Sequence, residues 1–158
     1  MRTLYLLPIL MIAGMITAKG QSEIAPVHNS ETIYFTKKVN GTMEEVYQQV
    51  VDALKVEKFA VITEVDMAKT LKEKLDVDIK PYRILGVCNS GSAYEALQAE
   101  PNIGVFLPCK VILKQLDDIT VEVVSANPEA LMKMLGNDKL DITAKEVAAK
   151  LEKVILGL

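Results

Sequence analysis

Two apolar stretches separated by a short acidic turn constrain the fold more than any other feature of the sequence. Residues 104–115 form a long run rich in β-branched and aliphatic side chains, and residues 119–125 alternate apolar with polar side chains. A period of two is typical of strands that bury one face. Because only Asp117 and Asp118 make the turn, the pattern predicts a hairpin. Hairpin strands run antiparallel, so at least part of the sheet is expected to be antiparallel.

The chain before and after this hairpin shows both strand-like and helix-like patterns. The clearest helix covers residues 43–54, where apolar side chains recur at i, i+3 and i+4 spacing after a capping box of Thr42 and Glu45. Capping boxes at Ser92 with Glu95 and at Thr143 with Glu146 predict the starts of two more helices. The other predicted strands cover residues 32–39, 59–66 and 81–88, and the other predicted helices cover residues 67–75, 92–100, 129–135 and 143–158.

This order of elements predicts an α+β domain. A doubly wound parallel sheet would need glycine-rich turns between strands and helices, and the sequence has none of that kind. Helices with one apolar face pack well on one face of an antiparallel sheet. We therefore expect a two-layer sandwich in residues 31–158, with a curved, mainly antiparallel sheet and helices on one face.

Composition excludes two classes of partner. The chain has 158 residues and half of them are apolar, which is enough for one domain with a real core. Lys and Arg number 18 against 21 Asp and Glu, giving a formal net charge of -3. Proteins that bind nucleic acids normally carry clustered basic residues, so no nucleic-acid partner is expected. A basic patch for a membrane surface is equally absent from the sequence.

The first twenty residues differ from the rest of the chain. One basic residue, Arg2, precedes an apolar run at residues 4–17, and small residues then occupy the -3 and -1 positions of a cleavage site. We predict that residues 1–20 are a cleaved signal peptide and that residues 21–30 are a linker. The mature domain would be periplasmic or extracellular, with no membrane partner after cleavage. The alternative is a membrane anchor formed by residues 4–17, a run shorter than the ~20 residues that normally span a bilayer.

The only histidine of the chain, His28, falls in this predicted linker. A Ser-His-Asp triad or a Cys-His pair would need that imidazole to reach back to the domain. Zinc or copper sites built from several imidazoles are excluded. The sequence also has no glycine-rich phosphate loop. A hydrolase or transferase is therefore the least expected function, and a protein without catalysis is favoured.

The two cysteines, Cys88 and Cys109, lie at the ends of one segment and allow three interpretations. The first interpretation is that they are small core residues, as free cysteines often are. The second is that they form a disulfide, which suits an exported chain. The third interpretation is a functional thiol pair that binds a soft metal such as Cu(I) or cycles between reduced and oxidised states. The alternation along residues 104–115 places Cys109 on the core-facing side together with Val105 and Leu107.

The stretch from Tyr82 to Lys110 contains a Cys-Asn motif at residues 88–89 and a Leu-Pro-Cys motif at residues 107–109. In these motifs the chain resembles the bacterial and archaeal family called domain of unknown function 302, and the resemblance spans nearly all of residues 31–158. Members often have proline after Cys-Asn, where this chain has Ser90-Gly91. The resemblance implies a fold similar to that of the TATA-binding protein and is compatible with a homodimer. It implies no reaction.

The motifs define the candidate site. It comprises Cys88, Asn89, Tyr94, Pro108, Cys109 and Lys110, with Cys88 and Cys109 as the candidate metal ligands. Each polar member also has a structural interpretation: Asn89 caps the next helix, Tyr94 packs in the core with its hydroxyl at the edge, and Lys110 is solvated. The favoured hypothesis is a binding module for a small ligand or soft metal, with Cu(I) or haem as examples. The alternatives are a thiol redox protein and a structural domain that acts as a dimer.

Overall fold

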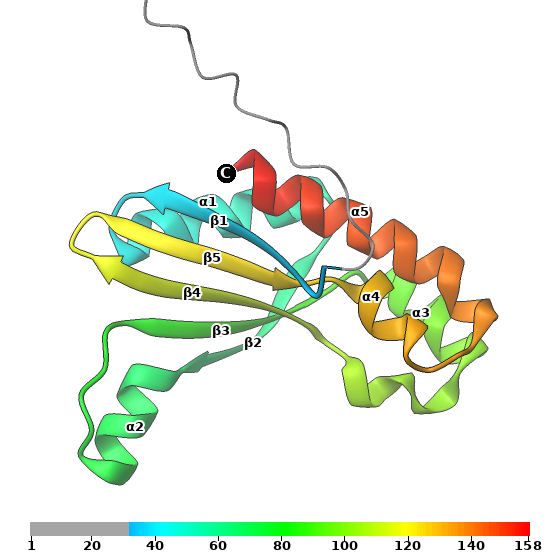
Figure 1. Cartoon of the computed structure of the whole chain (residues 1–158), viewed down its shortest axis with the longest axis horizontal. Coiled ribbons are helices and arrows are strands. Elements are labelled where there is room, and N and C mark those ends of the chain that lie inside the picture. Colours follow the sequence, from blue (N-terminus) through cyan, green and yellow to red (C-terminus); the bar gives the residue numbers. More distant parts are fainter. Residues whose placement is uncertain (1–31) are drawn as a thin grey trace, which may run out of the picture.

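The computed structural model describes residues 32–158, so the predicted signal peptide and the predicted linker lie outside the described residues. Five strands and five α-helices follow one another with two short 3-10 helices (Figure 1). They are β1 (Tyr34–Asn40), α1 (Met43–Val56), β2 (Ala60–Asp66), α2 (Met67–Leu75), β3 (Tyr82–Cys88), α3 (Ser90–Ala99), η1 (Pro101–Phe106), β4 (Cys109–Asp117), β5 (Thr120–Ala126), α4 (Pro128–Lys133), η2 (Asp138–Leu140) and α5 (Asp141–Gly157).

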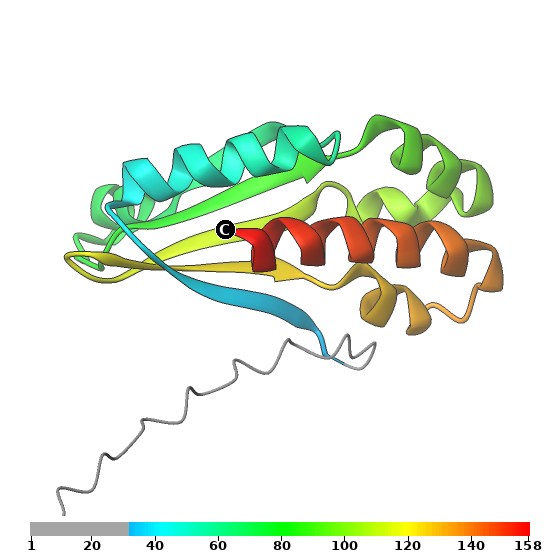
Figure 2. The ribbon, with the colours of Figure 1, turned by 90° about the horizontal axis from the view of Figure 1, so that it is seen from above.

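The strands form one antiparallel sheet in the order β1-β5-β4-β3-β2. The long helices α1 and α5 lie over the same face of this sheet, which confirms the α+β sandwich with helices on one face (Figure 2). The predicted hairpin is confirmed as β4 and β5, in which Asp117 pairs with Thr120 across the turn. Val121 and Val123 are fully buried against the helices.

Helix α1 forms where the sequence predicts it, for the predicted reason. The Thr42 hydroxyl accepts a hydrogen bond from the Glu45 amide, and the Glu45 carboxylate accepts one from the Thr42 amide at 2.9 Å. This capping box satisfies amides that have no partner within the helix. The helix buries the face formed by Met43, Val46, Val50 and Leu54.

The main core lies between the sheet and these two helices. Its fully buried side chains include Leu54 of α1, Leu85 of β3, Leu113 of β4 and Leu151 of α5. All four come from different elements, so the core ties the chain together over most of its length. Apolar burial on this scale is the main source of stability in a domain of this size.

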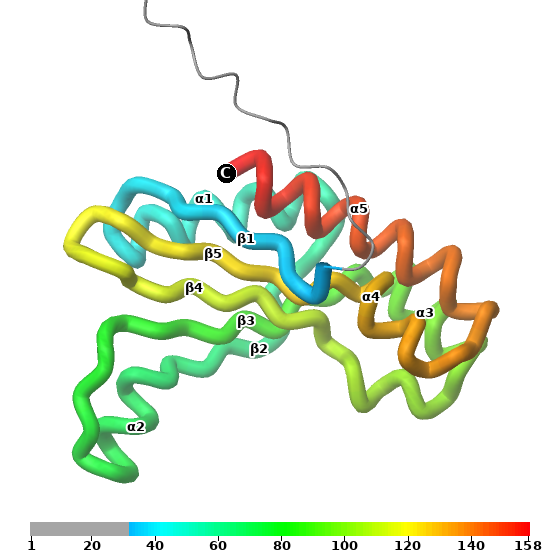
Figure 3. The backbone as a smooth tube through the Cα atoms, in the orientation of Figure 1, coloured from blue at the N-terminus to red at the C-terminus, as the bar shows by residue number. Residues whose placement is uncertain are grey.

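A second, smaller core lies beyond one end of the sheet. It is formed by α3, η1, α4 and η2 with the first turns of α5, and we call α3, η1, α4 and η2 together the helical lobe. Its buried members are Ile103, Met132, Leu140 and Ala144. The backbone trace shows the helical lobe at one end of the molecule, whereas α2 projects at the other end (Figure 3).

The predicted strand at residues 104–115 is wrong in its first part. Residues 101–106 form the 3-10 helix η1, and β4 begins only at Cys109. The Glu100 carboxylate accepts a hydrogen bond from the Asn102 amide, and Pro101 occupies the first helical position, where its fixed φ angle favours a helical turn. Val105 therefore does not share the face of Cys109 and is 84% exposed.

Two predicted capping boxes are also wrong. Helix α3 is capped by Asn89, whose side-chain oxygen accepts from the Ser92 amide at 3.2 Å. Helix α5 begins at Asp141 and has no side-chain cap. Instead, the Thr143 hydroxyl donates to a Glu95 carboxylate oxygen at 3.4 Å and so links α5 to α3. Each box therefore loses one member to a tertiary contact between helices.

The predicted helix at residues 129–135 is shifted. Helix α4 runs from Pro128 to Lys133, and the Asn127 side chain caps it by accepting from the amides of Glu129 and Ala130. Proline at the first helical position needs no amide partner, so the helix starts one residue earlier. Within residues 32–158, no helix is long and apolar enough to cross a membrane.

Candidate functional site

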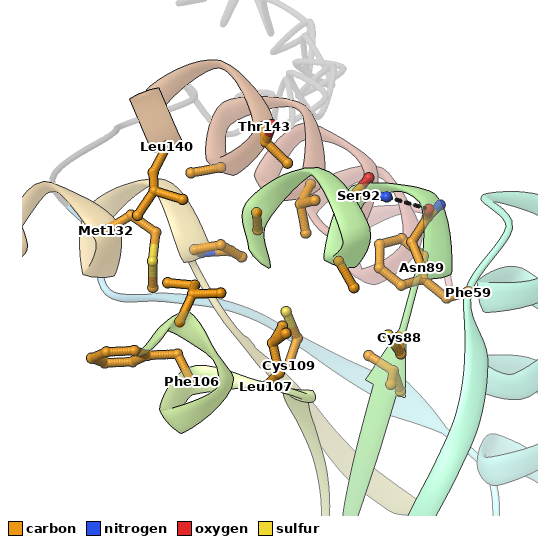
Figure 4. Close-up of a pocket in the computed structure, with 17 residues that line it drawn as sticks. Phe59, Cys88, Asn89, Ser92, Phe106, Leu107, Cys109, Met132, Leu140 and Thr143 are labelled. Atoms are coloured by element: carbon orange, nitrogen blue, oxygen red, sulfur yellow. Dashed lines mark hydrogen bonds between the residues drawn. The ribbon is translucent and has the colours of Figure 1, made fainter. Parts of the chain in front are cut away.

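A partly open cavity of about 60 Å³ lies where the ends of β3 and β4 meet the helical lobe. Figure 4 shows the side chains that line it, which come from the sheet on one side and from the helices on the other. Most are apolar: Phe59, Val87, Ala93, Ala96, Ile103, Phe106, Leu107, Pro128, Met132, Leu140, Ala144 and Val147. The remaining lining residues are Cys88, Asn89, Ser92, Cys109 and Thr143.

Two paired strands place both cysteine motifs at this cavity. Strand β3 ends at Cys88 and β4 starts at Cys109, and Val87 lies directly opposite Cys109 in the antiparallel register. The Cys109 sulfur points into the space between Met132 and Phe106 on one side and Phe59 on the other (Figure 4). The sequence prediction that Cys109 faces the core is confirmed, because Cys109 packs against the main core.

Small residues on α3 leave room for the cavity. Ala93 and Ala96 line it from one face of this helix, three residues apart. Neighbours at that spacing stand one above the other on a helix surface. With methyl groups there, the gap to Ile103 and Met132 stays unfilled, and well-packed interiors contain few voids of this size.

Two polar side chains at the cavity, those of Asn89 and Thr143, already have hydrogen-bond partners. The Asn89 side-chain oxygen accepts from the Ser92 amide, and the Thr143 hydroxyl donates to Glu95. These bonds hold the start of α3 and join it to α5. Among the described residues, no fully buried side-chain nitrogen or oxygen lacks a hydrogen-bond partner, so no such group is held ready for a polar ligand.

The disulfide interpretation of the cysteines is wrong, since both thiols are free. The register gives the reason. Val87 faces Cys109, and Cys88 is the next residue along β3. Cys88 and Cys109 are therefore not directly opposite each other in the ladder, although both line the cavity.

Burial governs the chemistry of the Cys109 thiol. The pKa of Cys109 is raised to about 11, chiefly by burial and in addition by the nearby Cys88 thiol, whereas the Lys110 ammonium acts in the opposite direction. The thiol is therefore protonated at neutral pH. Reactive and metal-binding cysteines instead have a lowered pKa in electropositive, partly exposed surroundings.

The remaining predicted site residues lie outside the cavity lining. Tyr94 is 65% exposed, so its predicted place in the core is wrong. Pro108 packs over Gly86 of β3. The Lys110 ammonium is exposed and donates to the Pro108 carbonyl oxygen at 2.6 Å. The structure thus brings together only Cys88, Asn89 and Cys109 of the six candidates.

A metal or haem finds little support in the described residues. Residues 32–158 contain no group of three or more His, Cys, Asp or Glu side chains placed to hold a metal ion. Pockets that enclose organic ligands typically measure roughly 300–1,000 Å³. A cavity of about 60 Å³ is far too small to enclose a haem.

Sequence reasoning missed most of the lining, including Phe59, Ile103 and Leu140. One signal was available in the pairing of small residues Ala93 and Ala96 on one predicted helical face. The lining residues from η1, α4 and η2 had no such signal, because only the tertiary fold brings those elements together.

Comparison with known proteins identifies the family. The model of the family described as "Domain of unknown function DUF302" matches residues 35–158. No curated protein matches the sequence. A similar solved structure is that of the uncharacterized conserved protein DUF302 from Bacillus stearothermophilus, which is 28% identical and superposes with a TM-score of 0.68. The match covers 77% of this chain and 95% of that chain. Since the family model matches most of the sequence, the chain belongs to the DUF302 family.

Proposed function

We propose that this protein is a non-catalytic binding module that holds a small apolar molecule, or the apolar end of a larger one, in the cavity beside Cys109. The observation that carries the proposal is the lining itself: twelve of its seventeen side chains are those of apolar residues, and the polar ones at Asn89 and Thr143 already have partners. Burying apolar surface there would stabilise a complex without any charged contact.

The same observations weigh against the other hypotheses from the sequence. A thiol redox protein needs a thiolate, and burial keeps Cys109 protonated at neutral pH. Cu(I) favours thiolate and thioether ligands, and Met132 and Cys109 both line the cavity. Metal binding would nevertheless require Cys109 to lose its proton in apolar surroundings, which its raised pKa opposes.

The size of the cavity limits the ligand. About 60 Å³ holds only a few heavy atoms, so a longer ligand would leave part of itself outside. Phe106 lines the cavity yet is 41% exposed, which places it at the mouth. An unbranched aliphatic chain fits this shape, because its end is narrow and its remainder can lie along an apolar rim.

Titration with 1-octanol tests this function. The protein without residues 1–20 is labelled with ¹³C at its methionine methyl groups. The Met132 signal is expected to shift in a saturable way, because Met132 lines the cavity. Met43 serves as an internal reference, since it is buried in the main core and should not respond.

A matched pair of variants locates the site. Ala96→Leu adds a larger side chain inside the cavity and is expected to abolish the Met132 response. Ala149→Leu makes the same change at an exposed position of α5 and should leave the response intact. The proposal fails if octanol never saturates the Met132 signal, or if Ala96→Leu binds as tightly as the parent while remaining folded.

We also propose that the chain is exported and loses residues 1–20. The support is the order of a basic residue, the apolar run at residues 4–17 and small residues before position 21. The intact mass of protein recovered from the producing cells tests this. A mass matching residues 21–158 supports cleavage, and a mass that includes residues 1–20 contradicts it.

A further inference from the structure

One side of the cavity is polar. Asn89 and Ser92 come from the start of α3 and Thr143 comes from the start of α5, and all three line the cavity. Figure 4 shows them along one side, with Phe106 on the opposite side. We call Asn89, Ser92 and Thr143 the polar side of the cavity. The apolar lining that carries the proposed function does not account for it.

The hydroxyl of Ser92 is free to bind a ligand. Ser92 is only 9% exposed, and its amide donates to Asn89. Within residues 32–158 its hydroxyl has no hydrogen-bond partner, although every fully buried side-chain nitrogen and oxygen there has one. The Ser92 oxygen is therefore not sealed off. Since Ser92 lines the cavity, its hydroxyl is open to whatever occupies that space.

The two neighbours of Ser92 keep part of their hydrogen-bonding capacity. The Asn89 side chain uses its oxygen to cap α3, and its two N–H donors have no acceptor among the described residues. The Thr143 hydroxyl gives its hydrogen to Glu95, which leaves its oxygen able to accept. The polar side therefore offers both donors and acceptors to one small group.

The surroundings favour a neutral group at the polar side. None of the seventeen described residues that line the cavity is Lys, Arg, His, Asp or Glu, so a charged group would have no ion partner in the lining. An unpaired charge is costly away from water. The Glu95 carboxylate, 3.4 Å from the Thr143 hydroxyl oxygen, would also repel an anion. A carboxylate ligand is therefore disfavoured.

From these observations we infer that the ligand of this cavity is an aliphatic alcohol. Its hydroxyl bonds Ser92 and Asn89, and its hydrocarbon part covers the apolar lining toward Met132 and Phe106. A hydroxyl is neutral and both donates and accepts, which matches the polar side. A water molecule would satisfy Ser92 but would leave the apolar lining uncovered. The inference rests on the proposed function and makes it more specific, because the end of the ligand that enters the cavity carries one hydroxyl.

Titrations with three eight-carbon ligands test the inference. They are 1-octanol, 1-fluorooctane, in which fluorine replaces the hydroxyl, and octanoate. The protein without residues 1–20 is used, and the Met132 methyl signal gives each affinity. The match to the solved relative covers 95% of that chain, which indicates that the domain folds alone.

The decisive variant is Ser92→Ala, which removes one oxygen atom. Because this hydroxyl has no partner among the described residues, the variant should fold as the parent does. Its affinity for 1-octanol should fall by about fivefold, the effect of one neutral hydrogen bond, whereas its affinity for 1-fluorooctane should not fall. The matched control Ser90→Ala makes the same change at an exposed position of α3 outside the lining, and it should bind 1-octanol like the parent.

The outcomes separate this inference from the proposed function. If 1-octanol never saturates the Met132 signal of the parent, both fail. If 1-octanol binds parent and Ser92→Ala equally well, the alcohol is overturned and the apolar cavity stands. Equal losses for 1-octanol and 1-fluorooctane also overturn it, because the variant then acts on cavity shape and not on the ligand hydroxyl. A loss that is larger for octanoate than for 1-octanol would replace the alcohol by a carboxylate.

Discussion

The two ends of this domain are packed in opposite ways. Where α1 and α5 cover the sheet, side chains such as Leu54, Leu113 and Leu151 are completely buried in one continuous core. Where the helical lobe meets the first turns of α5, four buried residues line a cavity, and large apolar side chains such as Val105 of η1 and Met134 after α4 are exposed to water. The difference teaches that tight apolar packing is concentrated in the sheet region, whereas the lobe leaves a cavity and exposed apolar side chains.

The largest expected difference between the two regions is in the stability lost when a buried leucine is replaced by alanine. Leu151→Ala opens a new void in the main core and is expected to destabilise the protein by about 3–5 kcal/mol. Leu140→Ala enlarges a cavity that already exists, so its cost should be nearer about 2 kcal/mol. Urea denaturation followed by circular dichroism measures both. Equal losses would show that the lobe is packed as tightly as the sheet region.

Two glycine-to-alanine substitutions, one in each region, compare the same two regions by adding a methyl group. A Cβ at Gly86 of β3 would lie 2.1 Å from the Thr63 hydroxyl oxygen and 2.6 Å from a Pro108 ring carbon. The Thr63 side chain can rotate away, but the Pro108 ring cannot, so Gly86→Ala should cost about 1–3 kcal/mol. Gly104 of η1 has no atom within 4 Å of such a Cβ, and Gly104→Ala should be nearly neutral. Thermal unfolding of both variants checks this, and a neutral Gly86→Ala would contradict the close contact.

Alkaline pH probes the boundary between the regions, where Cys109 lies. Burial raises the pKa of Cys109 to about 11 from the ordinary value of 9.0. The folded protein therefore keeps this proton between about pH 9 and pH 11, where the unfolded chain has lost it. Stability from this group is fully present below pH 9 and falls as pH rises, by about 1 kcal/mol at pH 10.

The variant Cys109→Ala isolates that contribution from other groups that titrate at high pH. The loss of stability between pH 8 and pH 10 should be smaller in the variant than in the parent, as measured by urea denaturation at each pH. An identical loss in both proteins would mean that the Cys109 thiol is not shielded from water.

The smallest expected effect concerns a polar cluster on the sheet region. The Arg83 guanidinium donates to both oxygens of Glu44 and lies 5.2 Å from the centre of the Tyr47 ring, which joins β3 to α1. Lysine cannot reproduce this forked contact, so Arg83→Lys should cost about 0.5–1 kcal/mol. Because Glu44 is largely exposed, the difference should shrink at high salt. A larger, salt-independent loss would indicate that Arg83 matters through packing.

Local patterns in the sequence were sufficient for much of the fold. The β4–β5 hairpin, helix α1 with its capping box and the α+β sandwich are all confirmed, because period-two and period-3.6 patterns directly reflect burial on one face. The alternative role of Asn89 as a helix cap is confirmed as well. Each depends on residues within a few positions of one another.

The site was less accessible to such reasoning. The sequence indicated Cys88, Asn89 and Cys109 through their motifs, and all three line the cavity. Tyr94, Pro108 and Lys110 come from the same motifs but lie elsewhere, because a motif marks a place in the chain and not the direction of each side chain. The homodimer remains a prediction, which the native mass at high concentration would check.

The sequence by itself indicated most of the helices and strands and the faces that they bury, whereas the pairing of β3 with β4, which brings the two cysteine motifs together, came only from the structure. Tertiary structure alone decided that residues 101–106 coil into η1, that Thr143 bonds Glu95 rather than capping its own helix, and that the alanines of α3 face a gap. The physical reason is the separation along the chain over which each kind of interaction acts. Burial patterns and caps act within one or two turns of chain, whereas a cavity exists only where elements far apart in sequence fail to fill the space between them.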